Sequence, residues 1–298
     1  TAVVTVGDDG GSSGRLRHEM GVLPPGDIRN CIAALADDED LVTKLFQYRF
    51  KTGEGLEGHS FGNLFLTALC SITGNMVRAV QESAKVLNIR GRVLPSTLDD
   101  MKLSAEMEDG TIVEGESNIP ETGKKIKRLF TTPANCKPLP EVIQAIKEAD
   151  LIILGPGSLY TSVIPNLLIK EISEAISKSS AKKIYVCNIM TQPGETTGYS
   201  AADHIQAILD HAGYPNMVQA MLVNNSLPDD LSPDYEKSDS FPVVVDVDTI
   251  KAKNINVVST RLYEENDQKY VRHSPSRLAR AIEYWYKKQL RAKDKAKK

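Results

Sequence analysis

The chain has 298 residues, of which 41% are hydrophobic, and a formal net charge of −3. This length is enough to bury a sizeable core, in one large or two modest domains. The near-neutral charge disfavours a nucleic-acid-binding protein, because such proteins usually carry a basic face. No apolar run of about 18 residues occurs, so we expect no membrane-spanning segment and no membrane partner.

The four cysteines are scattered along the chain and show no C-x-x-C spacing. They are Cys31, Cys70, Cys136 and Cys187. This pattern is typical of reduced thiols in a cytosolic protein rather than of disulfides or a zinc site. We therefore expect a cytoplasmic location.

The first part of the chain predicts one strand followed by helices. Residues 2–6 form an apolar, β-branched run that is typical of a buried parallel strand. The expected helices are residues 28–36 with Asp27 as N-cap, an amphipathic helix at 41–50 with Leu41, Leu45 and Tyr48 on one stripe, residues 60–72 closed by Gly74, and residues 76–87 capped by Asn75. Residues 89–94 then predict a strand.

A β-rich segment follows at residues 96–132. Residues 98–108 and 111–117 flank Asp109-Gly110, which is a strong signal for a β-hairpin. Residues 126–132 predict a further strand. Because helix–strand alternation resumes directly afterwards, we interpret this segment as a small insertion rather than a separate domain.

The following segment alternates helices with strands. Helices are predicted at residues 140–149, 167–177 and 201–211, and strands at 151–154, 183–186 and 220–223. Such alternation predicts an α/β fold with a mainly parallel sheet covered on both faces. We treat residues 1–298 as a single nucleotide-binding domain. Its C-terminal part, residues 228–298, is expected to be loosely structured before a last helix at 275–290.

The loop after the first strand is the most informative segment. Residues 7–17 combine two carboxylates, several glycines, two hydroxyls and two guanidinium groups. Ligands of open α/β sheets bind where strands end, glycines allow backbone N–H groups to approach an anion, and arginines match phosphate oxygens. Asp8 or Asp9 would hold a ribose hydroxyl or Mg²⁺. The alternative is an ordinary solvated turn.

Two expected helix starts carry further polar residues. Asp27, Arg29 and Asn30 lie at one start, where backbone donors and the helix dipole favour an anion. His59 and Asn63 flank the other start, and His59 is a candidate acid–base group. The alternatives remain simple capping by Asp27 and Ser60 beside a structural histidine.

Two later loops repeat the arrangement of a strand followed by small and polar residues. They are residues 155–162 and 188–196. Because parallel strands end at the same edge of a sheet, we expect all three loops to meet at one crevice. The chain lacks the G-x-x-x-x-G-K-[ST] P-loop. The residues thus predict a nucleotide- or phosphate-binding crevice, in which we identify no nucleophile.

Five ordered motifs carry a family resemblance that runs through almost the whole chain. Residues 6–17, 24–30, 58–63, 155–162 and 190–196 resemble gluconeogenesis factors of the YvcK type, which belong with the 2-phospho-L-lactate transferases of the CofD type. The resemblance implies a Rossmann-like three-layer fold and a cytosolic protein. It also implies a UDP-sugar ligand, above all UDP-N-acetylglucosamine (UDP-GlcNAc), and a role in gluconeogenic growth, cell-envelope precursor supply and cell shape.

The resemblance favours a regulator without catalytic activity. The alternative is a Mg-dependent, CofD-like transferase that moves a phospholactyl group from a guanosine diphosphate carrier to a deazaflavin. In that alternative Asp8 and Asp9 hold the metal. The resemblance further implies ligand contacts from Tyr235 and Arg272, since a tyrosine stacks on a base and an arginine forks to a diphosphate.

Together, the residues and the resemblance give a candidate ligand-binding set. It comprises Asp8, Asp9, Gly10, Gly11, Ser12, Ser13, Arg15, Asp27, Asn30, His59, Asn63, Gly155, Gly157, Ser158, Tyr160, Asn188, Thr191, Gln192, Tyr235 and Arg272. The expected ligand is a UDP-sugar, with a dinucleotide as the alternative, and Mg²⁺ is a further candidate in the transferase alternative.

The resemblance also suggests partners and an earlier start of the natural chain. The expected protein partner is an enzyme of the glucosamine-6-phosphate synthase type, and a homo-oligomer is a further expectation. Members of the family usually begin with a strand and a Gly-Gly-Gly-Thr-Gly loop, which are missing before Thr1. We expect that the natural protein contains them.

Overall fold

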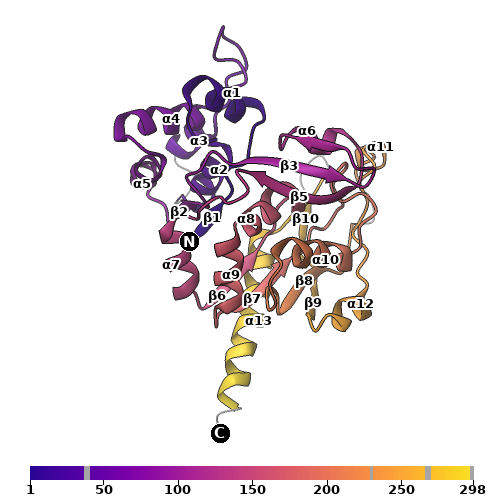
Figure 1. The fold of residues 1–298 in the computed structure, drawn as a ribbon. Coiled ribbons are helices and arrows are strands. Elements are labelled where there is room, and N and C mark those ends of the chain that lie inside the picture. The colour runs from indigo at the N-terminus through magenta and orange to yellow at the C-terminus, as the bar shows by residue number, and fades with distance from the viewer. Residues whose placement is uncertain (37–40, 229–230, 266–269, 296–298) are drawn as a thin grey trace. The chain divides into compact units, whose positions relative to one another are not determined.

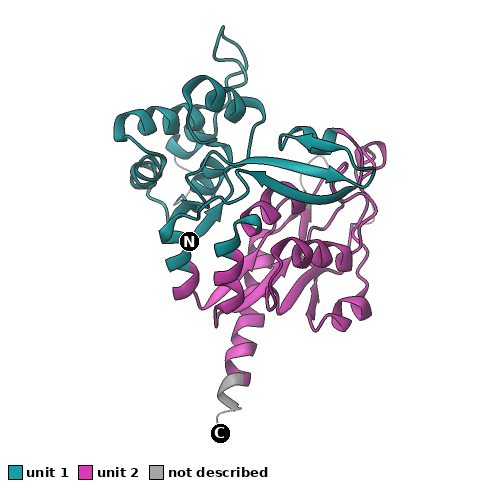
Figure 2. Cartoon of the chain, in the orientation of Figure 1, with its two compact units in different colours: residues 1–121, 126–145, 168–172 teal, residues 122–125, 146–167, 173–298 magenta. Residues whose placement is uncertain are grey.

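The computed structural model describes residues 1–36, 41–228, 231–265 and 270–295. Figure 1 traces the chain from its indigo N-terminus to its yellow C-terminus. The chain divides into two compact units, coloured separately in Figure 2. Unit 1 comprises residues 1–121, 126–145 and 168–172, and unit 2 comprises residues 122–125, 146–167 and 173–298. Both units are therefore built from discontinuous segments.

Unit 1 begins with a parallel pair of strands, β1 (Ala2–Val4) and β2 (Val93–Pro95). The helices between them are α1 (Gly11–Met20), α2 (Gly26–Leu35), α3 (Leu41–Gln47), α4 (Phe61–Thr73) and α5 (Met76–Val86). The signals around α4 and α5 are confirmed. Ser60 caps α4, Gly74 ends it at φ 86°, and Asn75 caps α5.

Three predictions for this region are wrong. The predicted loop at residues 7–17 is helical from Gly11, where α1 begins. Helix α2 already begins at Gly26, so Asp27 lies in its first turn and is not its N-cap; the preceding residue is Pro25. Helix α3 ends at Gln47, and the predicted stripe of Leu41, Leu45 and Tyr48 is exposed. Instead Phe46 is buried, and its ring packs edge-on against Phe65 of α4.

The β-rich insertion is a three-stranded antiparallel sheet. Strands β4 (Ile112–Glu114) and β5 (Ile126–Thr132) flank β3 (Lys102–Met107). The hairpin turn forms as predicted at Asp109-Gly110, where the N–H of Thr111 donates to Asp109 Oδ1 at 2.9 Å. A short helix, α6 (Asn118–Glu121), follows β4.

Unit 2 is organised around a parallel sheet of four strands. Their order is β6 (Leu151–Leu154), β7 (Lys182–Val186), β8 (Ala220–Asn224) and β9 (Asn256–Thr260). Ile184 and Leu222 cluster with Trp285 of α13 (Pro275–Lys295), whereas the adjacent residues Tyr185 and Met221, which point to the opposite face, are also fully buried. Both faces of the sheet are therefore covered, as the predicted Rossmann-like α/β class requires.

The remaining elements complete the connections. They are α7 (Pro140–Glu148), the π-helix η1 (Leu159–Val163), α8 (Ile164–Leu168), α9 (Lys170–Lys178), α10 (Ala201–Ala212), α11 (Asp234–Lys237), α12 (Val247–Ala252), β10 (Tyr263–Glu265) and β11 (Val271–His273). All four cysteines are free. Within the described residues, no helix combines the length and apolar character that crossing a membrane requires.

Candidate functional site

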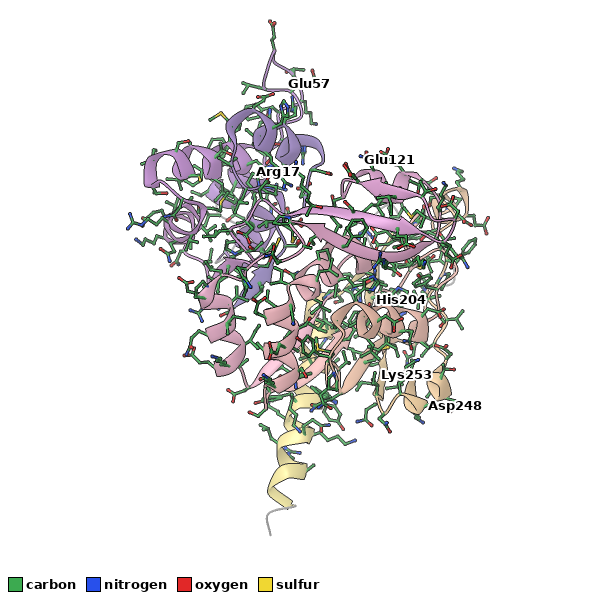
Figure 3. All side chains as sticks on the ribbon, in the orientation of Figure 1. Arg17, Glu57, Glu121, His204, Asp248 and Lys253 are labelled. Atoms are coloured by element: carbon green, nitrogen blue, oxygen red, sulfur yellow. The ribbon has the colours of Figure 1, made fainter. Side chains whose placement is uncertain are left out.

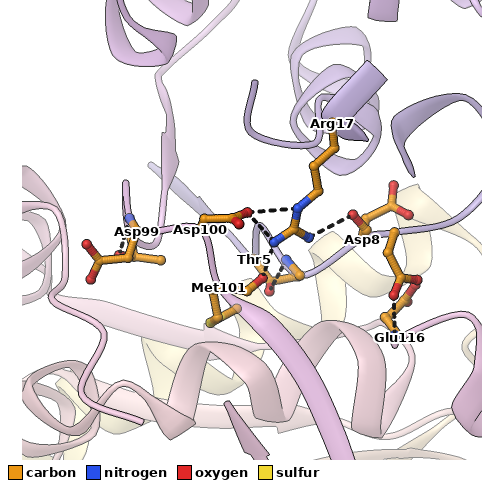
Figure 4. A network of polar contacts seen from close by, with 10 residues as sticks. Thr5, Asp8, Arg17, Asp99, Asp100, Met101 and Glu116 are labelled. Atoms are coloured by element: carbon orange, nitrogen blue, oxygen red, sulfur yellow. Dashed lines mark hydrogen bonds and ion pairs between the residues drawn. The ribbon is translucent and has the colours of Figure 1, made fainter. Parts of the chain in front are cut away.

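The loop after β1 is held by contacts within unit 1. The N–H of Gly10 donates to Asp8 Oδ1 at 2.9 Å. The two carboxylate oxygens of Asp9 accept from the backbone N–H groups of Glu116 and Ser117 at 3.0 and 2.9 Å. Figure 4 shows Asp8 beside Arg17, whose guanidinium donates to the backbone oxygen of Asp8 and to the carboxylate of Asp100. Asp9 thus fastens the segment after β4, a structural role that the sequence did not reveal.

Asp8 lies close to the start of α2. A Cβ added at Gly26 would come within 2.7 Å of Asp8 Oδ2. Burial, with a further contribution from the charge of Asp8, raises the pKa of Asp27 to about 6, and Arg29 partly opposes this. Arg29 Nη2 donates to Asn30 Oδ1 at 2.7 Å. The start of α2 therefore holds a carboxyl group whose protonation changes near neutral pH.

A hydrogen-bonded group joins the first turns of α1 and α4. Ser12 Oγ lies 2.9 Å from His59 Nδ1, and Asn63 Nδ2 donates to Ser12 Oγ at 3.1 Å and to Ser13 Oγ at 3.5 Å. Burial and the charge of Arg15 lower the pKa of His59. The buried Oδ1 of Asn63 has no hydrogen-bond partner within the described chain. Asn63 Oδ1 is therefore an acceptor that a ligand could use.

The serine–histidine pair was missed by sequence reasoning, although a signal existed. Residues 10–14 and 58–62 both have G-x-S-x-G spacing, which is typical of nucleophilic serines in one class of hydrolases. Here Ser60 serves as the N-cap of α4. Ser12 and His59 are only 4% and 5% exposed. We therefore interpret both serines as structural.

Arg15 occupies the exposed side of α1. Its Nη2 donates to the backbone oxygen of Glu57 at 2.6 Å. Glu57 is labelled in Figure 3, in the loop between α3 and α4. Gly11, with φ 46°, begins α1. The unit 1 candidates thus gather at the starts of α1, α2 and α4, where helix dipoles favour anions, and their ligand contacts stay predictions.

In unit 2, the loops after β6 and β7 are joined by side chains. Gln192 Nε2 donates to Ser158 Oγ at 2.7 Å, and Asn188 Nδ2 donates to Gln192 Oε1 at 2.9 Å. Thr191 is held by the segment before α12, since its Oγ1 accepts from the N–H of Phe241 at 2.8 Å. Of the three loops predicted to meet, these two do so, because their strands end at the same edge of the sheet. The loop after β1 belongs to unit 1, and its convergence with them stays a prediction.

These loops line a cavity of about 480 Å³. Seven predicted ligand residues lie on its wall: Gly157, Ser158, Asn188, Thr191, Gln192, Tyr235 and Arg272. Asp234, Ser238, Ser240, Tyr270 and His273 also line it and were not predicted. We call it the first cavity.

Gly155 and Tyr160 do not line the first cavity, and the structure gives both a structural role. Gly155 has φ 74°, and an added Cβ would lie 3.0 Å from the backbone oxygen of Val186. The hydroxyl of Tyr160 lies 2.7 Å from that of Tyr199, and its N–H donates to Glu195 Oε2 at 3.1 Å. Both residues therefore hold the loop in place without lining the cavity.

The strand pair β10–β11 brings late residues to the first cavity. The guanidinium of Arg272 lies 6.0 Å from the ring centre of Tyr270. His273 Nε2 lies 3.2 Å from the backbone oxygen of Cys187, and burial lowers the pKa of His273. Tyr235 is 8% exposed. The cavity wall therefore offers the cation of Arg272, the carboxylate of Asp234, a neutral imidazole, hydroxyls and amides.

Comparisons with known proteins place the chain in a family. A family model described as 2-phospho-L-lactate transferase CofD matches residues 1–263. Gluconeogenesis factors of Bacillus subtilis and Halalkalibacterium halodurans are 52% and 51% identical over 94% and 95% of this chain, which correspond to 88% and 87% of their own lengths. The chain belongs to the gluconeogenesis factor family, within the CofD superfamily. The resemblance predicted from five motifs is confirmed.

A solved structure and a longer relative agree with this family. A crystal structure of a Bacillus halodurans protein matches with a TM-score of 0.91 and 52% identity, covering 94% of this chain and 90% of that chain. A Nostoc relative is 56% identical over 96% of this chain. This chain spans 63% of the length of the Nostoc protein.

Proposed function

We propose that this gluconeogenesis factor family member binds a UDP-sugar, UDP-GlcNAc in particular, in the first cavity and acts as a regulator. The observation that carries the proposal is that seven predicted ligand residues line that one cavity. Its volume of about 480 Å³ lies within the usual range of small-molecule sites.

The charges and donors of the cavity suit a nucleoside diphosphate sugar. Arg272 supplies a planar pair of donors for phosphate oxygens, which a lysine lacks. Ser158 and Ser240 add hydroxyls, and Asn188 offers an amide for ribose or sugar hydroxyls. Asp234 also lines the wall, but Lys237 and the hydroxyl of Tyr270 donate to its carboxylate. With that charge paired, Arg272 and the neutral donors suit an anion attached to a polyhydroxylated group.

The names of the relatives support a wider role. Two of them are called gluconeogenesis factors, so we propose that this protein serves gluconeogenic growth. We further propose that it acts in the cytoplasm on cell-envelope precursor supply and cell shape. In this scheme ligand occupancy controls association with an enzyme of the glucosamine-6-phosphate synthase type, and self-association is a further proposal.

Calorimetry with UDP-GlcNAc on the full-length protein tests the proposed ligand. We expect UDP-GlcNAc to bind. UDP, which lacks the amino sugar, and GDP, which also carries guanine in place of uracil, should bind more weakly. GlcNAc alone serves as the control for the diphosphate. No heat of binding at millimolar UDP-GlcNAc would overturn the proposal.

The second candidate function is a phospholactyl transferase, with which the CofD family model agrees at the level of the superfamily. It requires Asp8 and Asp9 to hold Mg²⁺ against a diphosphate. Asp8 accepts one backbone N–H bond through Oδ1, whereas both oxygens of Asp9 already accept backbone N–H bonds. Among the residues that the structure describes, no group of three or more His, Cys, Asp or Glu side chains is arranged to hold a metal. Chromatographic detection of the deazaflavin product would establish this function over the first.

A further inference from the structure

A second cavity of about 440 Å³ lies in unit 2 at the ends of β7, β8 and β9. Its wall includes Asn225 and Ser226, which follow β8. It also includes Ser259 of β9, which pairs with Val223 of β8 in the sheet register. Asn188 and Ile189 line both this cavity and the first one. The two cavities therefore adjoin across a single segment of the chain.

The two cavities differ in charge. Arg272 and Asp234 line the first cavity, whereas none of the described residues that line the second is an Asp, Glu, Lys, Arg or His. Its one titratable side chain is Cys187, and burial raises the pKa of that thiol, so it is neutral. Since burying a charge without a counter-charge is costly, the second cavity suits an uncharged group.

The wall of the second cavity also includes a residue with a buried polar atom that lacks a partner among the described residues. Ser226 Oγ is buried and has no hydrogen-bond partner within the described chain. The adjacent Asn224 is engaged at both ends of its amide, because its Oδ1 accepts from the N–H of Leu262 at 2.9 Å and its Nδ2 donates to the backbone oxygen of Ser226. A buried hydroxyl without a partner is unfavourable, so a ligand that pairs with it gains affinity.

One wall of the second cavity is apolar and extended. Val243, Val245 and Val247 line it, whereas Val244 between them is 68% exposed. Asp246 is directed elsewhere, since its carboxylate accepts from Ser200 Oγ and from the N–H of Ala202, both at 2.9 Å. The alternation gives a strip of methyl groups opposite the polar edge, which fits a flat ring or an acetyl methyl group.

We infer that the second cavity binds the uncharged, amide-bearing end of the nucleotide sugar whose diphosphate lies in the first cavity. An amide places an N–H beside a C=O, which matches the donor and acceptor of the Asn225 side chain and the hydroxyl of Ser226. The uracil base and the acetamido group both have this chemistry. The inference rests on the proposed function and adds a selectivity element to it.

A matched pair of valine substitutions tests the inference. Val245→Phe fills the second cavity, whereas Val244→Phe places the same ring on the exposed side of the same segment. By calorimetry we expect Val245→Phe to weaken UDP-GlcNAc binding at least tenfold and Val244→Phe to leave the affinity within twofold. Asn225→Ala, at an exposed position, is expected to weaken UDP-GlcNAc binding about three- to tenfold, the equivalent of one hydrogen bond.

Two partial ligands distinguish the sources of the amide. UMP carries the base without the sugar, and N-acetylglucosamine 1-phosphate carries the sugar without the base. Asn225→Ala should weaken the one whose amide occupies the second cavity and leave the other unchanged. Weaker binding of either partial ligand by Asn225→Ala supports the inference and shows whether the base or the acetamido group occupies the second cavity. Normal UDP-GlcNAc binding by Val245→Phe and Asn225→Ala would overturn this inference alone, and no binding by the unaltered protein would overturn the proposed function as well.

Discussion

The hydroxyl of Tyr235 accepts a hydrogen bond from the backbone N–H of Val271 at 2.8 Å, which joins α11 to β11. The ring of Tyr235 also packs edge-on against Tyr270, with centroids 5.4 Å apart. Both tyrosines line the first cavity. One phenol therefore fixes two walls of the candidate site relative to each other.

Removal of that hydroxyl should loosen the site. In Tyr235→Phe the buried N–H of Val271 loses its partner, so we expect the free energy of unfolding to fall by about 1–3 kcal/mol. Urea denaturation measures this change. Tyr284→Phe, at a tyrosine that is 70% exposed on α13, should have no effect. Equal stability of Tyr235→Phe and the unaltered protein would show that the hydrogen bond contributes nothing.

Arg272 is expected to supply the main charge for the ligand. Arg272→Ala should weaken UDP-GlcNAc binding by about 1.5–3 kcal/mol, the range for hydrogen bonds to charged groups. Arg272→Lys should restore only part of this, because an ammonium lacks the planar fork and stacks less well beside Tyr270. Calorimetry gives the affinities, and Arg78→Ala, an exposed arginine in α5 of unit 1, is the control. An unchanged affinity of Arg272→Lys for UDP-GlcNAc would contradict a forked contact.

Local signals predicted the elements whose pattern is set by their own residues. Strands β5 and β6 have the predicted bounds, and the capping residues of α4 and α5 were identified. Helix α3 was misjudged because its stripe of large apolar residues faces solvent while Phe46 packs on α4. Which side of a short helix is buried depends on its neighbour, and that information is not local.

The same distinction applies to the candidate site. The loops after β6 and β7 were predictable, since a strand followed by small polar residues marks them. His273 and Tyr270 were not, because they reach the first cavity through the pairing of β10 with β11. Strand β9 was also missed: its residues Asn256 and Ser259 weaken the apolar pattern, and its place beside β8 is fixed by long-range pairing.

The raised pKa of Asp27 predicts a dependence of stability on pH. Its pKa is about 6 in the folded protein against 3.8 as the ordinary value. Between these values the folded state binds more protons than the unfolded state, so stability falls as pH rises through this window and stays lower above it. Asp27→Asn removes the effect and should be more stable than the unaltered protein at pH 7, by up to about 3 kcal/mol.

The comparison at low pH provides the check. Near pH 4 the advantage of Asp27→Asn should vanish, because Asp27 is then protonated in the folded state. Thermal unfolding between pH 4 and pH 8 follows the difference. Asp248→Asn, on α12 of unit 2 and labelled in Figure 3, serves as an exposed control. A constant difference at all pH values would show that the carboxyl of Asp27 is not perturbed by burial.

Gly10, which caps α1, and Gly14, within α1, should respond differently to an added methyl group. A Cβ at Gly14 would lie 1.9 Å from the backbone oxygen of Asp9, whereas a Cβ at Gly10 would have only ordinary contacts of 3.5 Å or more. We expect Gly14→Ala to lower the free energy of unfolding by about 3 kcal/mol and Gly10→Ala to change it by less than about 1 kcal/mol. Chemical denaturation of both variants tests this, and similar stabilities would contradict the close approach.

Ligand-gated association with a partner is the remaining consequence of a regulatory role. A ligand shifts an association only if it binds the free and associated forms with different affinity, and the effect is reciprocal. We therefore expect recovery of a glucosamine-6-phosphate synthase-type enzyme in a pull-down to differ between samples with and without UDP-GlcNAc. The Arg272→Ala variant, which should bind the ligand poorly, should give the ligand-free recovery in both samples. Identical recovery by the unaltered protein in both conditions would argue against gating and favour the transferase reading, since a ligand that leaves the association unchanged must serve another purpose in the site.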